Sequence, residues 1–252
     1  DWVQKHIKYV AIEDGDNGLV PSEAALVMQR RYGDCKGKTS LLVSMIRAAG
    51  LKASYAWVGS RERPYKYSAF PSVVNDDHMI AVWWDGDNPV ILDGTTFSHR
   101  MEDIPAFIQG KECMIEKGKD DFMVYLIPVA PSSGNRVSDS LFISISGNAL
   151  TGYGKLTYYG ENKAGMMRIF EGKDTSLYKR ILQNALLKAS NKHMVKSVSI
   201  SDVYDTENPF VVHYTFLLPD FITHTATNTY VNLNLDRFLS DIIITPDRDI
   251  PL

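Results

Sequence analysis

Cysteine is scarce in this sequence: Cys35 and Cys113 are the two that occur among 252 residues. Two thiols are too few for a disulfide-rich scaffold, and they are too few for a zinc site built from cysteines. The count still allows one unpaired, reactive thiol, so a cysteine-based activity stays among the functions to consider.

An excess of charge of one sign and long apolar runs are also lacking. The 27 Lys and Arg residues nearly balance the 30 Asp and Glu residues, and no basic tract stands out, so we expect no nucleic-acid partner. No apolar run approaches the roughly 18 residues of a membrane-spanning helix, and no signal peptide opens the sequence. The sequence enters a helical pattern directly at Asp1, from which we expect a further domain of the same chain upstream.

The sequence does contain enough apolar material for a packed core, since 44% of its residues are apolar and 11% aromatic. Its first fifty residues show helical spacing, with one short helix predicted after Pro21 and a second from about Cys35 to Gly50. Glycine is the usual residue at the left-handed end of a helix. Cys35 is therefore expected at a helix N-terminus.

Strand patterns follow in residues 51–58, 78–84 and 89–93, which are rich in β-branched and aromatic side chains. The turn signal at residues 85–88 predicts that the last two strands are antiparallel neighbours. Residues 59–76 form a long connection that contains Arg61 and several aromatic residues. Two interpretations of it stay open: it lines a substrate groove, or it is a solvated loop whose aromatic rings cover the sheet.

Linker composition at residues 128–135 predicts a boundary between one domain at 1–128 and a second at 129–252. The second domain has one predicted amphipathic helix over residues 175–189 and five predicted strands, at 141–146, 153–159, 195–203, 211–218 and 230–235. We predict an α+β protein in which N-terminal helices pack on an antiparallel sheet and a β-rich domain follows.

The stretch RYGDCKGKTSLL, residues 31–42, offers two kinds of chemistry. Its Gly-Lys-Thr end is similar to a phosphate-binding loop, but such a loop has about four residues between its glycines, and here three separate Gly33 from Gly37. The residues before Gly33 are also polar and helical in pattern, where a buried strand is required. We reject a nucleotide site. A thiol at a helix start is favoured as an anion, which can lower a cysteine pKa from about 8.5 to roughly 3.5–7.5.

A nucleophilic thiol needs a base, and the base needs a group that orients it. His78 opens one predicted strand and Asp93 closes the next, so antiparallel pairing brings them to the same edge of the sheet. A helix start packed over that edge brings Cys35 to the imidazole. Three other interpretations stay open: Cys35 is a buried structural thiol, Asp76 or Asp77 orients His78, or the three residues bind zinc.

Three segments resemble the transglutaminase-like superfamily of cysteine enzymes, within the papain-like fold: RRYGDCKGKTSLLVSMIRAAGL, NDDHMIAVWW and ILDGTT. The resemblance covers residues 1 to about 115. It implies that Cys35 is the nucleophile, His78 the base and Asp93 the orienting carboxylate. Tyr9 stands where the family often offers an aromatic polar group to the oxyanion, and an amphipathic packing role for Tyr9 stays equally open. The sequence departs from the family pattern at Gly37, where an acidic residue is usual, and at Gly94, where proline is common.

The whole chain also resembles bacterial multidomain proteins in which such a core adjoins β-rich domains of unknown function. The C-terminal part of this match is carried by residues 152–160 and Arg168. By this resemblance alone we expect an exported protein, periplasmic or at the cell surface, and the sequence otherwise leaves its compartment unknown.

The expected function is acyl transfer on amide bonds of a peptide or protein substrate, of protease or transglutaminase type, through an acyl-thioester. We expect no metal and no organic cofactor. The alternative is a catalytically inactive binding or scaffolding module that keeps the fold, because a fold does not imply an activity.

Overall fold

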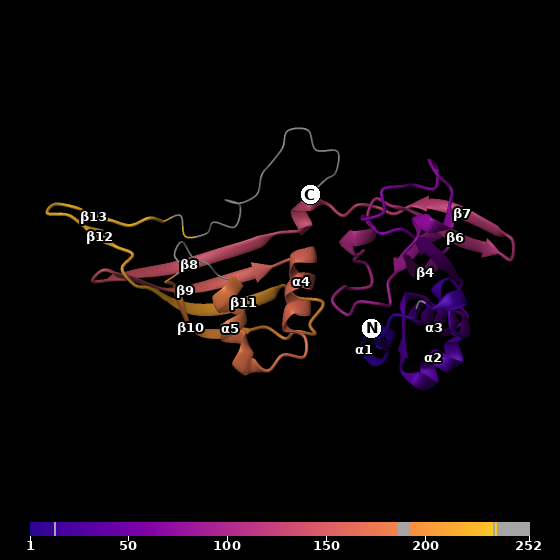
Figure 1. Cartoon of the computed structure of the whole chain (residues 1–252), viewed down its shortest axis with the longest axis horizontal. Coiled ribbons are helices and arrows are strands. Elements are labelled where there is room, and N and C mark those ends of the chain that lie inside the picture. Colours follow the sequence, from indigo (N-terminus) through magenta and orange to yellow (C-terminus); the bar gives the residue numbers. More distant parts are fainter. Residues whose placement is uncertain (13, 186–191, 234, 236–252) are drawn as a thin grey trace. The chain divides into compact units, whose positions relative to one another are not determined.

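A computed structural model describes residues 1–12, 14–185, 192–233 and 235 of the chain (Figure 1). The chain divides into two compact units. The first comprises Asp1–Arg136, Tyr159–Arg168 and Thr206–Asn208, and the second comprises the remaining described residues. The predicted division after residue 128 stays a prediction. Among the described helices, none is long and apolar enough to cross a membrane.

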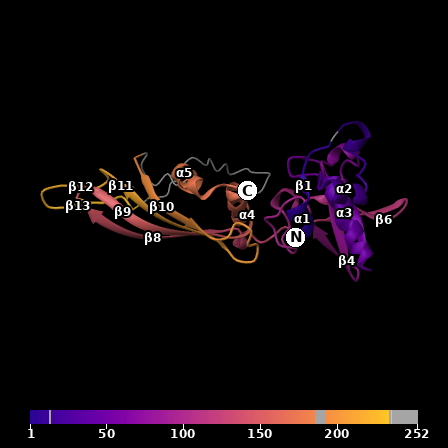
Figure 2. The same ribbon diagram turned by 90° about the horizontal axis from the view of Figure 1, so that it is seen from below.

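The helical part of the first unit consists of α1 (Trp2–His6), α2 (Ala24–Arg30) and α3 (Cys35–Ala48). Between them the short strands β1 (Lys8–Tyr9) and β2 (Tyr32–Gly33) pair in parallel. Helices α2 and α3 lie beside each other in both views (Figure 1 and Figure 2). Gly33 and Gly37 allow this approach, since a Cβ at Gly37 would come within 3.2 Å of Val27.

A five-stranded antiparallel sheet in the order β5-β4-β3-β6-β7 forms the rest of this unit. Its strands are β3 (Ala53–Val58), β4 (His78–Asp85), β5 (Asn88–Leu92), β6 (Glu112–Gly118) and β7 (Asp121–Leu126). Helix α3 packs on β4 and β3. The hairpin between β4 and β5 turns at Gly86, whose φ of 60° suits glycine. The sequence analysis predicted β3, β4 and β5 but assigned no strands to β6 and β7.

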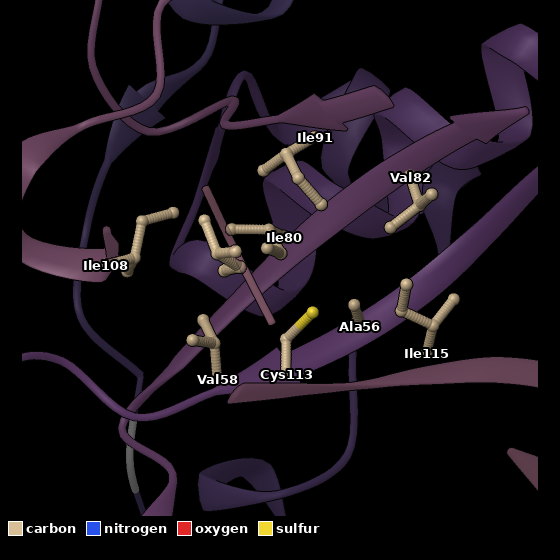
Figure 3. Packing of buried hydrophobic residues seen from close by; sticks show 9 residues of the cluster. Ala56, Val58, Ile80, Val82, Ile91, Ile108, Cys113 and Ile115 are labelled. Atoms are coloured by element: carbon tan, nitrogen blue, oxygen red, sulfur yellow. The ribbon is translucent and has the colours of Figure 1, made fainter. Parts of the chain in front are cut away.

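The core of the sheet is a cluster of aliphatic side chains from its strands together with Ile108 and Ile127. The side chain of Cys113 lies within this cluster, beside those of Val58 and Ala56 (Figure 3). Cys113 is fully buried, and burial raises the pKa of its thiol to about 12. The second cysteine of the sequence is therefore a packing residue.

The second unit contains a four-stranded antiparallel sheet in the order β10-β11-β9-β8. Its strands are β8 (Val137–Ser146), β9 (Ala149–Tyr158), β10 (Met194–Ile200) and β11 (Phe210–Leu218). Gly152 and Gly154 of β9 lie opposite Phe216 and Tyr214 of β11. A Cβ at either glycine would come within 2.5 Å of the aromatic ring, so these rings cover bare backbone.

Helix α5 (Thr175–Ala185) packs on β10, and the rest of its predicted span, 186–189, lies outside the described residues. The predicted strand at 230–235 is wrong in extent: β13 (Thr229–Tyr230) pairs with β12 (Thr223–His224) and ends there. The sequence analysis did not predict helix α4 (Gly160–Phe170). The prediction of an α+β fold, with helices on an antiparallel sheet and a β-rich region, is confirmed.

Candidate active site

Cys35 is the first residue of α3, and its side chain is nearly buried, with the residue 7% exposed. Asp34 precedes it as the N-cap and accepts a hydrogen bond from the Gly37 amide at 2.8 Å. The other carboxylate oxygen of Asp34 forms an ion pair with Lys36, and both side chains are buried. The negative charge next to the thiol is thus offset by Lys36 and by the helix amides.

His78 is the first residue of β4, and Asp93 follows the last residue of β5. The two strands pair with Ala81 opposite Leu92. His78 Nε2 lies 3.0 Å from Asp93 Oδ2. The antiparallel hairpin therefore brings together two residues that are 15 positions apart in the sequence.

Asp93 is held from several sides. Its side chain is 2% exposed. Its Oδ1 accepts hydrogen bonds from the Thr95 amide at 2.7 Å and from Thr95 Oγ1 at 2.5 Å, and its carbonyl accepts one from Gln4 Nε2 at 3.0 Å. The Asp93–Thr95 contact is an Asx turn, in which an Asp side chain bonds the backbone two residues on. The carboxylate thus has a fixed orientation toward His78.

Cys35 contacts His78 because α3 is tied to β4. Thr39, one turn after Cys35, donates a hydrogen bond from Oγ1 to the carbonyl of Met79 at 2.9 Å. Hydrogen bonding and charge from Cys35 are among the causes that raise the pKa of His78, so the thiol lies close to the imidazole. The structure therefore brings Cys35, His78 and Asp93 into one series, with the imidazole in the middle.

The protonated form of His78 is favoured in this series. Burial lowers the pKa of His78, but hydrogen bonds to Asp93 and Cys35 and the charges of both outweigh burial and raise the pKa to about 10. For Asp93, burial alone would raise the pKa. The contacts with His78 and Thr95 outweigh burial and lower the pKa of Asp93 below its usual value. Both shifts favour an ion pair between protonated His78 and ionised Asp93.

The remaining residues named by the sequence lie around this series. Tyr9 is 48% exposed, and its Cα pairs with that of Gly33, two residues before Cys35. Asp76 accepts a hydrogen bond from Tyr67, and Asp77 bonds Ser60 and Arg63. His78 makes its carboxylate contact with Asp93.

The positions of the His, Cys, Asp and Glu side chains also bear on metal binding. Among the described residues, no group of three or more His, Cys, Asp or Glu side chains could hold a metal ion.

Two aromatic rings of the long segment 59–76, those of Tyr65 and Phe70, are more than half exposed, whereas Tyr67 is partly buried. Arg61 of this segment lines a cavity of about 530 Å³, together with residues of the loop that follows Asp93 and of α4. The amide of Arg61 donates to the carbonyl of Phe107 at 2.7 Å, which anchors the segment there. This observation favours the groove-lining interpretation for Arg61.

Thr95 and Phe107 are site residues that the sequence analysis missed. The ring of Phe107 packs edge-on against that of His78, with centroids 5.1 Å apart, and it covers the imidazole from one side. The Asp-Gly-Thr sequence of the Asx turn could have revealed Thr95. No sequence signal connects Phe107 with His78.

One comparison with known proteins agrees with the resemblance seen in the sequence. Residues 1–88 match the model of the transglutaminase-like superfamily, which confirms that resemblance for about a third of the chain. The matched segment includes Cys35 and His78 and ends before Asp93. A comparison with curated proteins found no match.

A search of solved structures found a crystal structure from Parabacteroides distasonis that is described as a "putative protease". The two chains are 11% identical and superpose with a TM-score of 0.40. The alignment covers 91% of this chain and 45% of that one, so this chain spans less than half the length of that protein.

Proposed function

We propose that this protein is a cysteine enzyme that transfers the acyl group of an amide in a peptide or protein substrate. In this proposal Cys35 is the nucleophile, His78 the general base and acid, and Asp93 the group that orients His78. The observation that carries the proposal is the position of the His78 imidazole, whose Nε2 lies 3.0 Å from Asp93 Oδ2 and whose pKa is raised by both Asp93 and Cys35. The superfamily match over residues 1–88 supports it.

The first step of the proposed reaction forms a bond between Cys35 Sγ and the amide carbonyl carbon. The carbonyl oxygen becomes an oxyanion, which hydrogen-bond donors at the start of a helix can stabilise. Asp34 occupies the amides of Gly37 and Lys38, so the donors would be those nearer Cys35. The side chain of Tyr9 is a further proposed donor.

Collapse of the oxyanion then breaks the carbon–nitrogen bond. The imidazolium of His78 gives its proton to the departing amine, which leaves an acyl-thioester on Cys35. In the second half, His78 removes a proton from water or from an acceptor amine, and that nucleophile displaces the thiolate. Water yields a carboxylic acid by hydrolysis, and an amine yields a new amide.

Thiol labelling tests the nucleophile directly. An imidazolium next to the sulfur favours the thiolate, which is the form that reacts with iodoacetamide. We expect Cys35 to be labelled at about pH 6 in the wild-type protein, and to lose that reactivity in a His78→Ala variant. Cys113 is the internal control, because burial raises its pKa to about 12. Labelling of Cys35 only above about pH 8, and no faster than Cys113, would favour an inactive binding module.

Substrate assays then separate the two outcomes of the thioester. Peptides with and without glutamine are incubated with the wild-type protein, in the presence or absence of a small primary amine, and Cys35→Ala is the control. Release of a new peptide terminus indicates a protease, and incorporation of the amine indicates a transferase.

A further inference from the structure

Two of the residues that line the cavity next to the candidate active site also belong to that site. Thr95 lines the cavity and also donates two hydrogen bonds to Asp93. Phe107 lines the cavity and also packs against the ring of His78. Cys35 is not one of the lining residues. The cavity therefore lies beside the His78–Asp93 pair. A substrate residue next to the reacting amide can enter the cavity there.

The size of this cavity suits a part of a substrate. Its volume of about 530 Å³ falls within the range of roughly 300–1,000 Å³ that is typical of ligand pockets. Such a volume holds one large side chain with its water, or two small residues. All of its lining residues belong to the first unit.

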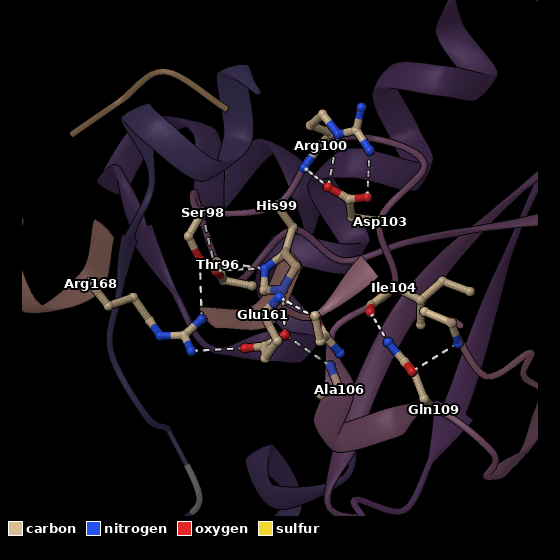
Figure 4. A network of polar contacts seen from close by, with 12 residues as sticks. Thr96, Ser98, His99, Arg100, Asp103, Ile104, Ala106, Gln109, Glu161 and Arg168 are labelled. Carbon is tan, nitrogen blue, oxygen red and sulfur yellow. Dashed lines mark hydrogen bonds and ion pairs between the residues drawn. The ribbon is translucent and has the colours of Figure 1, made fainter. Parts of the chain in front are cut away.

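One side of the cavity is a closed polar network (Figure 4). Glu161 Oε2 accepts from His99 Nε2 at 2.9 Å and from the Ala106 amide at 3.2 Å. Its Oε1 accepts from Arg168 at 2.9 Å, and Arg168 also donates to Ser98 Oγ at 3.1 Å. The carboxylate of Glu161 is thus occupied at both oxygens, and its charge is balanced by Arg168.

Arg61 is a charged residue of this lining that no described residue balances. Its guanidinium makes no ion pair or hydrogen bond with any residue that the structure describes. With Glu161 and Arg168 cancelling each other, the cavity carries the net positive charge of Arg61. The hydroxyl groups of Thr95 and Thr96 add polar atoms to the same lining.

We propose that this cavity binds a carboxylate group of the substrate through Arg61, next to the amide that reacts. This inference rests on the proposed function, and it specifies the substrate class as acidic. A guanidinium binds a carboxylate with two parallel hydrogen bonds. The carboxylate comes from a Glu or Asp side chain of the substrate or from the free C-terminus of a peptide.

Binding to an inactive variant tests the proposal without requiring turnover. Cys35→Ala is titrated into fluorescein-labelled hexapeptides of an alanine background, in which one glutamate is moved through every position. Each peptide has a partner with glutamine at that position, and each is made with a free or an amidated C-terminus. We expect one Glu position, or the free C-terminus, to bind at least about tenfold more tightly than its neutral partner, since hydrogen bonds between charged groups are stronger than those between neutral groups. The two arms identify the source of the carboxylate.

Substitution of Arg61 shows whether it is the binding group. In the Cys35→Ala background, Arg61→Gln is expected to bring the ratio of the two affinities to about one, and Arg61→Glu to reverse it in favour of a Lys-containing peptide. Lys66→Gln is the matched control, because Lys66 lies in the same segment, is exposed and does not line the cavity. This variant keeps the ratio of the parent.

Two results would overturn the proposal: affinities that are equal for every acidic and neutral pair, or a preference that persists in Arg61→Gln. Failure of the proposed function gives a different result. In that case the wild-type protein shows no activated thiol and no turnover, while the preference for the acidic peptide and its loss in Arg61→Gln remain.

Discussion

Two histidine–carboxylate pairs lie at the two ends of the loop that runs from Asp93 to His99. His78 Nε2 is 3.0 Å from Asp93, and His99 Nε2 is 2.9 Å from Glu161. Both imidazole rings are buried. The pairs therefore have the same geometry, and what distinguishes them is the group at the far oxygen of the carboxylate and the other neighbours of the imidazole.

In the described part of the chain the far oxygen of Asp93 accepts from the neutral donors of Thr95, whereas that of Glu161 accepts from the guanidinium of Arg168. Of the contacts described for Asp93, the one that can supply a cation is His78. A proton is therefore held on His78, whose pKa is raised to about 10 despite burial. At Glu161 the effect of burial is outweighed by the contacts with His99 and Arg168, which lower the pKa of the carboxyl to about 2.

The other neighbours of the imidazole complete the difference. Cys35 adjoins the ring of His78, whereas Nδ1 of His99 lies 3.4 Å from the hydroxyl groups of Thr96 and Ser98. A histidine–carboxylate pair is thus a candidate catalytic pair where a nucleophile adjoins it. Where a permanent cation and hydroxyl groups adjoin it, the pair fastens α4 to the loop.

Removal of each imidazole should separate the two pairs most strongly. We expect His78→Gln to lower turnover by about 10²–10⁴-fold, the usual contribution of a general acid–base group. His99→Gln should lower it by no more than about tenfold, since His99 would touch no reacting atom. The measurement is kcat on the same peptide for both variants. Equal losses would mean that the two pairs do not differ in function.

The pH dependence of stability sharpens the same contrast. His78 has a folded-state pKa above its unfolded value of about 6.5, so its stabilising contribution is full below about pH 6.5 and is lost as the pH rises through about 10. Each pKa unit corresponds to about 1.4 kcal/mol. We expect the difference in unfolding free energy between the wild-type protein and His78→Gln to shrink by at least about 2 kcal/mol between pH 6 and pH 10.5. Urea denaturation at a series of pH values measures it, and a constant difference would contradict the ionised pair.

Glu161 should respond at the opposite end of the pH scale. Its folded pKa is lowered to about 2 from 4.5, so its contribution is present above about pH 4.5 and is lost as the pH falls through about 2. We expect Glu161→Gln to cost about 1–3 kcal/mol at pH 7, since hydrogen bonds to a charged group are lost. Glu171→Gln on an exposed position is the matched control. If the two variants unfold at the same urea concentration, the network is not stabilising.

The two pairs also differ in how far the sequence predicted them. Helical spacing ending at Gly50 predicted the start of α3 at Cys35, and the turn at residues 85–88 predicted that His78 and Asp93 share one sheet edge. These are local patterns of period and turn. Their catalytic roles stay predictions.

Such local patterns do not predict contacts between segments that are far apart in the sequence. His99 and Glu161 are 62 residues apart, and no local period connects them. The sequence pattern did not predict strands β6 and β7 either, because Glu, Lys and Asp interrupt the apolar alternation of residues 112–126. There the pairing with β3 and burial in the core outweigh the weak local pattern.

The smallest expected effect concerns the turn that orients Asp93. Gly94 departs from the family pattern, and a looser turn would weaken the first pair alone. A Cβ at Gly94 would meet Lys38 Cβ and Val3 Cγ1 at 3.6 Å, an ordinary contact distance. Gly94→Ala should therefore change stability by no more than about 0.4–1 kcal/mol, in the stabilising direction, because it restricts the unfolded chain. Gly59→Ala is the contrasting variant, since its Cβ would overlap the Asn75 carbonyl and should destabilise the fold. Thermal denaturation compares them, and a destabilised Gly94→Ala would show that the turn at Asp93 depends on glycine.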